Sequence, residues 1–491
     1  MIWHGDDPPA RQRGMVFLLF LVAIAVTMAT LMGGMLRLFD PRAAAEREQS
    51  DLLRSARELL IADLLAPDAD QPPTGRRLGQ WRLLPDLPIP PGPGADATEP
   101  NYDGLAETAG CASQGWAPML PVMDVSVFGS SARCFGRLPW RDLGLRVDDD
   151  GGRDIAGKLP WLVVSPNLAA PMACLRDLNP LALGSSYIGY ACPSNPPYPW
   201  IKVLDERGNL LSDRVAFALI LPGTPLAGQD RTAAYATPGS VIAPPSAYLD
   251  TVTVASGCAM PCQPGTYSNA AFNHLDGQPT VLIRAPVDEA AAERSGNYAT
   301  PYRFNDRIAF VTADELFLEL ERRARGELIR ALLAFRAMHG HFPYASPLAS
   351  GGGDCASGTR LGHVPVVDGS CGAGRSLTMP SWFTDAGWHR YFVYAASPTC
   401  VQSNPVCSGP GLTVGTRTDI RALIIAPRAA ITASPYAPSR GAAQTPVNMV
   451  GLSGLLSDYL DDAAYATPVP DVFIDTANAS PPINDLLVVV E

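Results

Sequence analysis

The chain is poor in charge and lacks the short motifs that mark common hydrolases and nucleotide-binding proteins. Asp, Glu, Lys and Arg make up 17% of its 491 residues, whereas about a quarter is usual. It contains no His-Glu-x-x-His, no phosphate loop of the Gly-x-x-x-x-Gly-Lys-Ser/Thr type and no Gly-x-Ser-x-Gly sequence. Metalloprotease, phosphate-loop and nucleophile-elbow chemistry therefore have no recognisable centre here. We expect a protein that is not an enzyme and has no cofactor.

Positive charge is also scarce. The formal net charge is −11 and the isoelectric point is near 5.1, which disfavours a nucleic-acid partner because such proteins need a basic surface. Asp148, Asp150 and Asp154 gather oxygens of the kind that calcium uses, but their spacing differs from an EF-hand. They are weak calcium candidates, and otherwise we expect no metal. His339 and His341 are predicted to be exposed at a polar helix end.

Cysteine is absent from the first 110 residues and occurs ten times after them. An even number of cysteines confined to one part of a chain is typical of an oxidising compartment such as the bacterial periplasm. Zinc is disfavoured because Cys258 and Cys262 have no second pair at ligand spacing. Sequence alone does not prove the connectivity. Pairing of neighbours gives the candidate disulfides Cys111–Cys134, Cys174–Cys192, Cys258–Cys262, Cys355–Cys371 and Cys400–Cys407.

Residues 15–36 carry no charge and, as a helix, would extend about 33 Å, enough to cross a hydrocarbon core. We therefore expect a leader at 1–14 and a transmembrane helix at 15–36, with the N-terminus in the cytoplasm and the bulk of the chain in the periplasm. Two alternatives remain open, which are a plain single-pass anchor and ordinary signal-peptide cleavage near residues 43–45. Arginines on both sides of the segment leave the orientation unsettled by charge.

Two amphipathic helices are predicted after this segment. The first begins at Pro41, which suits the first turn of a helix, and ends before Pro67. The second covers residues 313–338, with Thr312 and Glu315 as a capping box and Gly340 as the stop. Short apolar runs, such as 215–221 and 420–426, indicate buried strands. The Asn-Asp pairs at 305–306 and 484–485 are predicted to bond nearby backbone and set strand register.

Short signatures recur in the same order behind both helices, which indicates an internal repeat. Each member of the first half has a counterpart in the second. The paired segments are 138–140 with 379–382, 161–166 with 394–398, 214–222 with 421–427, 248–250 with 459–461, and 304–311 with 483–490. The predicted fold class is α+β, with two tandem modules at 41–311 and 312–491, each a helix followed by an antiparallel sheet.

The basic leader, Gly14 and the apolar run resemble the class III methylation region of type IV pilins and type II secretion pseudopilins. Segments 138–140, 143–145 and 165–167 (Leu-Pro-Trp, Leu-Gly-Leu and Ser-Pro-Asn) are similar to those of large pilin-like proteins of proteobacteria. The resemblance implies cleavage by prepilin peptidase between Gly14 and Met15, with Arg13 in the leader, and N-methylation of Met15. It also implies contacts with inner-membrane lipid and with other pilin subunits through the N-terminal helix.

One position departs from the pilin pattern. Major pilins have glutamate at the fifth residue of the mature chain, and this chain has Leu19 there. The K-type minor pseudopilin is similar in lacking that glutamate. The resemblance therefore favours a minor or tip subunit. The alternatives are an anchored periplasmic binding or adhesion protein that enters no filament, and an anchored hydrolase with a dispersed active site.

Overall fold

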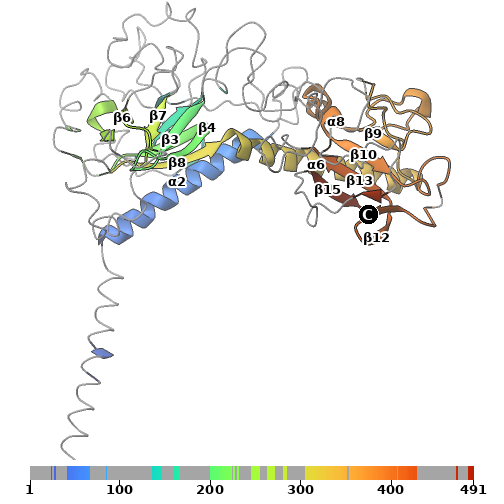
Figure 1. Ribbon diagram of the computed structural model, residues 1–491, viewed down its shortest axis with the longest axis horizontal. Coiled ribbons are helices and arrows are strands. Elements are labelled where there is room, and N and C mark those ends of the chain that lie inside the picture. Colours follow the sequence, from blue (N-terminus) through green and yellow to red (C-terminus); the bar gives the residue numbers. More distant parts are fainter. Residues whose placement is uncertain are drawn as a thin grey trace, which may run out of the picture. The chain divides into compact units, whose positions relative to one another are not determined.

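The computed structural model describes eleven main segments, together with a few single positions. These segments are 41–66, 135–145, 159–165, 200–223, 245–254, 262–270, 280–284, 305–350, 353–405, 407–427 and 485–491. The fold is α+β with more strands than helices (Figure 1). The chain divides into two compact units, Met1–Ser55 and Ala56–Glu491. The boundary falls inside helix α2 (Pro41–Leu65), and all four sheets of the described residues belong to the second unit.

The expected N-terminal transmembrane helix is wrong for the part of the chain that the structure describes. None of the helices described there is both long and apolar enough to cross a membrane. The predicted segment, 15–36, lies almost wholly outside the described residues. The first long helix that is described, α2, carries Arg47, Glu48 and Asp51 in its early turns and is amphipathic rather than apolar. Within the second unit, α2 contributes Ala56, Leu60 and Leu64, which are all buried.

The first sheet has six strands in the order β1-β2-β4-β3-β7, with β8 paired to β4. Most neighbours are antiparallel, but β3 and β7 run parallel, so the predicted purely antiparallel sheet is wrong. The hairpin β5–β6 packs on it through Val254, which joins a cluster with Leu204 and Ile283. The bounds are β1 Phe135–Arg137, β2 Trp161–Val164, β3 Ile201–Leu204, β4 Leu210–Leu221, β5 Thr251–Val254, β6 Gly265–Ser268, β7 Val281–Ile283 and β8 Arg307–Thr312, with a 3-10 turn, η4, at Pro245–Ala247.

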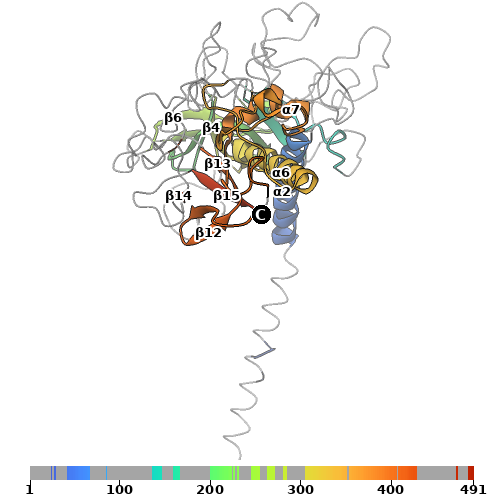
Figure 2. The ribbon, with the colours of Figure 1, turned by 90° about the vertical axis from the view of Figure 1, so that its right-hand side faces the viewer.

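The second sheet has the order β15-β13-β10-β9, with antiparallel pairs throughout (Figure 1). Its strands β13 and β15 lie side by side in Figure 2 as well. A smaller sheet, β12-β11-β14, includes one parallel pair. The predicted strand at 420–426 is two strands, because β12 ends at Ile420 and β13 begins at Ala422. The bounds are β9 Leu361–His363, β10 Val393–Ala396, β11 Leu412–Val414, β12 Arg417–Ile420, β13 Ala422–Ala426, β14 Val472–Phe473 and β15 Leu486–Val490, with η6 at Gly369–Cys371, α7 at Ser381–Asp385 and α8 at Trp388–Tyr391.

Three strands of the first sheet pair with one another in the same register as three strands of the second sheet. Strands β2, β4 and β8 pair in the same order and direction as β10, β13 and β15. The equivalent pairs are Val164–Phe217 with Ala396–Ala422, and Phe217–Val311 with Ala422–Val490. The serine after each first strand bonds the middle strand, at 2.8 Å from Ser165 N to Ala216 O and 2.9 Å from Ser397 N to Arg421 O. Three of the five paired signatures, 161–166 with 394–398, 214–222 with 421–427 and 304–311 with 483–490, therefore lie on matching strands, and the duplication itself stays a prediction.

Helix α6 (Ala313–His339) forms where the sequence predicts it. The Thr312 hydroxyl accepts a hydrogen bond from the Glu315 N–H at 3.1 Å, and the Glu315 carboxylate forms an ion pair with Arg57. Gly340 ends the helix in the left-handed region at φ 76°, which favours glycine. The helix packs against β4 and β8 and also against β15. Its buried residues are Ala313, Leu316, Phe317, Leu320, Glu321, Ala324, Leu328, Leu332 and Phe335.

Two glycines of α6 provide a matched stability test. A Cβ added at Gly326 or at Gly340 meets no atom within 4 Å, but only Gly340 has a positive φ, +76°. We expect Gly326→Ala to raise stability by about 1 kcal/mol, because alanine favours a helix interior. Gly340→Ala should lower it by about 1 kcal/mol, because a side chain is strained in the left-handed region. Thermal unfolding of the two variants measures the effects, and shifts of the same sign would contradict this account.

Candidate functional site

Several predicted site residues lie outside the described residues. They are Arg13, Gly14 and Met15 of the processing junction, the calcium candidates Asp148, Asp150 and Asp154, and five cysteines, Cys111, Cys134, Cys174, Cys192 and Cys258. The candidate sites below come from the remaining part of the chain. Within it, no group of three or more His, Cys, Asp or Glu side chains could hold a metal ion.

All five cysteines in the described part of the chain are in disulfides. Cys355 bonds Cys371 with a Cα–Cα distance of 5.7 Å, and Cys400 bonds Cys407. Both pairs join sequence neighbours, as the sequence predicts. Cys262 is disulfide-bonded as well. Cys407 has φ 51°, so the second bond ends on a residue in the left-handed region that side chains rarely adopt.

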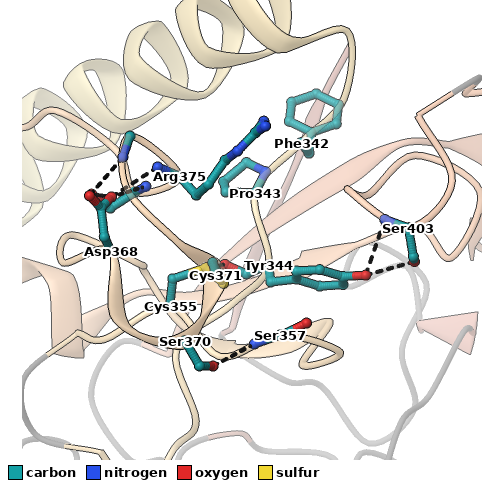
Figure 3. Close-up of a disulfide and its surroundings, with 12 residues drawn as sticks. Phe342, Pro343, Tyr344, Cys355, Ser357, Asp368, Ser370, Cys371, Arg375 and Ser403 are labelled. Atoms are coloured by element: carbon teal, nitrogen blue, oxygen red, sulfur yellow. Dashed lines mark hydrogen bonds between the residues drawn. A yellow bond between two sulfur atoms is a disulfide. The ribbon is translucent and has the colours of Figure 1, made fainter.

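The Cys355–Cys371 bond lies beside a turn organised by Asp368 (Figure 3). One carboxylate oxygen of Asp368 accepts hydrogen bonds from the N–H groups of Arg375 and Ser376 at 2.9 and 2.8 Å, and from the Ser376 hydroxyl at 2.7 Å. The other oxygen accepts from the Gly374 N–H at 2.7 Å. These donors lower the pKa of Asp368 to about 2, because they favour the charged form. We call residues 368–376 the Asp368 turn.

The Cys400–Cys407 bond closes a second segment. This segment contacts residues 342–344, which follow α6. The Tyr344 hydroxyl donates to Ser403 Oγ at 2.6 Å and accepts from the Ser403 N–H at 3.2 Å. Phe342 pairs with Val401 in a parallel bridge, and its N–H donates to Cys400 O at 2.9 Å. Figure 3 shows Tyr344 reaching Ser403. Residues 342–344 therefore contact the segment that the second disulfide closes.

A histidine–arginine cluster, His339, His341 and Arg375, joins the end of α6 to the Asp368 turn. Arg375 Nη1 lies 3.2 Å from His339 Nδ1 and 3.5 Å from His341 Nε2. The expectation that both histidines are exposed is wrong for His341, which is 4% exposed. His341 lies past the end of the helix, and its Nδ1 is 2.9 Å from the Phe342 carbonyl oxygen. Phe335 packs against both imidazoles, with centroid distances of 4.3 Å to His339 and 5.8 Å to His341.

A second polar cluster lies at the start of β8, where Asp250 and Asp306 are both buried. Asp306 Oδ2 accepts from the Asp250 N–H at 2.8 Å and from Asn269 Nδ2 at 2.9 Å. Asp250 accepts from the Asn305 N–H at 2.6 Å and from Gln229 Nε2 at 2.8 Å. The prediction that Asp306 bonds nearby backbone is therefore wrong, since its backbone partner is 56 residues away.

Burial controls the charge of these two aspartates. It raises the pKa of Asp306 to about 8, with a further contribution from the neighbouring Asp250 carboxylate. Burial also raises the pKa of Asp250. The equivalent position in the second sheet, Asp485, is 1% exposed. A carboxyl group kept neutral at pH 7 is a common feature of catalytic sites, but here the hydrogen bonds join β-strand ends and loops of one sheet. We interpret the pair as a structural cluster.

The aromatic residues Trp382, Trp388 and Tyr391, which follow α6, are core residues. Trp388 is fully buried and stacks on Phe317 of α6 at 5.6 Å between ring centroids. The Tyr391 hydroxyl donates to Glu321 Oε2 at 2.9 Å, and Glu321 is 1% exposed. Sequence reasoning missed this buried carboxylate. The sequence did contain an indication of its burial. Glu321 lies four residues after Phe317 and three before Ala324, so it belongs to the buried face of the helix.

Comparisons with protein-family models, with curated proteins and with solved structures find no match to this chain.

Proposed function

We propose that this chain is a non-enzymatic minor or tip subunit of a type IV pilus or type II secretion filament. The observation that carries the proposal is that every cysteine in the described part of the chain is disulfide-bonded, and all ten cysteines follow the Gly14-Met15 junction. Disulfides persist in the periplasm and are rare in the cytosol. Paired cysteines behind a pilin-type leader junction support export by the pilin route.

Two further features support the same proposal. Helix α6 lies along strands of both sheets, which is the helix-on-sheet arrangement expected of a pilin module. The size of the chain, 491 residues, suits a subunit present in few copies better than one repeated along a filament. The proposed partners are prepilin peptidase, inner-membrane lipid and other pilin subunits, and the proposed place of the disulfide-bonded part is the periplasm.

The N-terminus of the isolated full chain tests this function. In cells that contain prepilin peptidase, we expect the chain to begin at N-methylated Met15, and in cells without it to retain residues 1–14. A Gly14→Val variant should keep the leader in both strains, because the peptidase cuts after the glycine. Gly5→Val, a matched change within the leader, should be processed normally. Intact mass and peptide sequencing report each outcome.

Retention of residues 1–14 in the presence of the peptidase would overturn the filament proposal. It would leave an anchored binding or adhesion protein as the better account. A chain that starts near residue 45 in both strains would also overturn it, because ordinary signal-peptide cleavage would then explain export.

A further inference from the structure

The histidine–arginine cluster has a defined proton arrangement. His341 Nδ1 lies 2.9 Å from the Phe342 carbonyl oxygen, and a carbonyl only accepts, so Nδ1 carries the hydrogen. His341 Nε2 therefore presents a lone pair. Arg375 Nη1 donates toward this nitrogen and toward His339 Nδ1, at 3.5 and 3.2 Å. A guanidinium has no acceptor, so both contacts require neutral imidazoles.

We propose that the histidine–arginine cluster is an acid-sensitive contact, in which protonation of His339 expels Arg375 and releases the Asp368 turn from the end of α6. A proton on His339 Nδ1 would point an N–H at the guanidinium and place two positive charges about 3 Å apart. The hydrogen bond would be lost and the like charges would repel. Phe335 packs against both imidazoles and is 6% exposed in the closed arrangement, so we expect its exposure to rise when the imidazoles separate from the turn.

Three other charged groups belong to this region. Asp368 holds the turn through four hydrogen bonds, and its pKa of about 2 keeps it ionised above pH 4. Arg375 contributes a guanidinium, which only donates hydrogen bonds. Arg336, on the last turn of α6, lies over the ring of Phe342 at 5.4 Å. We therefore assign the pH dependence to His339.

The direction of the pH effect follows from His339. Burial, then Arg375 and then His341 lower the pKa of His339 below its ordinary value. The released state, with an ordinary imidazole pKa of about 6.5, binds a proton more readily than the closed state. The closed arrangement is therefore fully favoured above about pH 6.5 and loses stability as the pH falls below that value.

Hydroxyl-radical footprinting of the full chain tests this inference. We expect oxidation of Phe335 to rise several-fold between pH 7.5 and pH 5.0, below the ceiling of about 30-fold that one ordinary imidazole permits at pH 5. Phe383, which is fully buried in the same part of the chain, reports global unfolding and should stay protected at both pH values.

Matched variants separate the cluster from other causes. In a His339→Asn, His341→Gln double variant, the amide oxygens replace the accepting nitrogens but do not titrate, so Phe335 oxidation should be the same at both pH values. Arg375→Met removes the contact and should give high oxidation at both. The inference would be overturned by wild-type oxidation that does not change with pH, or by an equal rise in the double variant.

Discussion

Replacing Asp306 with alanine is expected to lower the free energy of unfolding by about 3 kcal/mol, because two buried donors lose their acceptor. The donors are the Asp250 N–H and Asn269 Nδ2, which both bind Asp306 Oδ2. Asp306 is fully buried, so water does not replace the lost carboxyl group without rearrangement. Guanidinium denaturation of the full chain, followed by tryptophan fluorescence, measures the change.

Asp306→Asn is the matched control, because its amide oxygen accepts the same two hydrogen bonds. The pKa of Asp306 is raised to about 8, so wild type folds with this group protonated at neutral pH. The ordinary pKa of this carboxyl is 3.8, so stability from this group is fully present below about pH 4, is lost progressively as the pH rises from about 4 to about 8, and levels off above that value. The asparagine variant should be within about 1 kcal/mol of wild type near pH 4 and should not show the loss between pH 4 and pH 8. Equal damage from alanine and asparagine would contradict the hydrogen-bond explanation.

Removing the Cys355–Cys371 bond by a double alanine substitution is expected to cost about 3 kcal/mol, as a closed loop of this length predicts. The two cysteines are 16 residues apart, and the bond lies beside the Asp368 turn. Removing Cys400–Cys407, whose cysteines are 7 residues apart, should cost less, about 2.5 kcal/mol in the same loop-closure model. Urea denaturation with and without a dithiol reductant measures both bonds.

One result would contradict the prediction that these disulfides stabilise the fold. If neither substitution shifts the unfolding midpoint, and the reductant has no effect on wild type, the disulfides do not stabilise the fold. The disulfides would then not contribute to the stability of the exported protein.

Local signals were enough to predict α6 from sequence. Thr312 and Gly340 cap the two ends through contacts within four residues, and the apolar positions between them repeat every three or four residues. Both effects depend only on neighbours in the chain, so they are readable without the tertiary structure. The disulfides between sequence neighbours belong to the same class, because short loops are the easiest to close.

Contacts between residues distant in sequence were not predictable. The Asp306 side chain resembles a turn residue in sequence, and its bond to the Asp250 N–H depends on the path of the chain between them, which includes strands β5, β6 and β7. Arg375 meets His339 across 36 residues, and nothing in the local pattern around either residue indicates the other. The parallel pair β3–β7 is similar, because apolar alternation identifies a strand but not its direction.

The N-terminal region shows a different limit. Hydropathy predicts a spanning helix at 15–36 from composition alone, whereas no helix in the described part of the chain meets the length and apolarity needed. Hydropathy measures preference for an apolar surrounding and does not specify what a segment packs against. The function proposed above therefore depends on the processing experiment and not on the fold.

In each of the two disulfides for which both cysteines are described, no other cysteine lies between the two partners in the sequence. Four cysteines allow three connectivities, and this one closes the shortest loops. The order of synthesis already brings the correct partners together first, so each bond can form while the later part of the chain is still emerging. The last of the described strands, β15, follows both disulfides in the chain, so it can join β13 after these covalent links are in place.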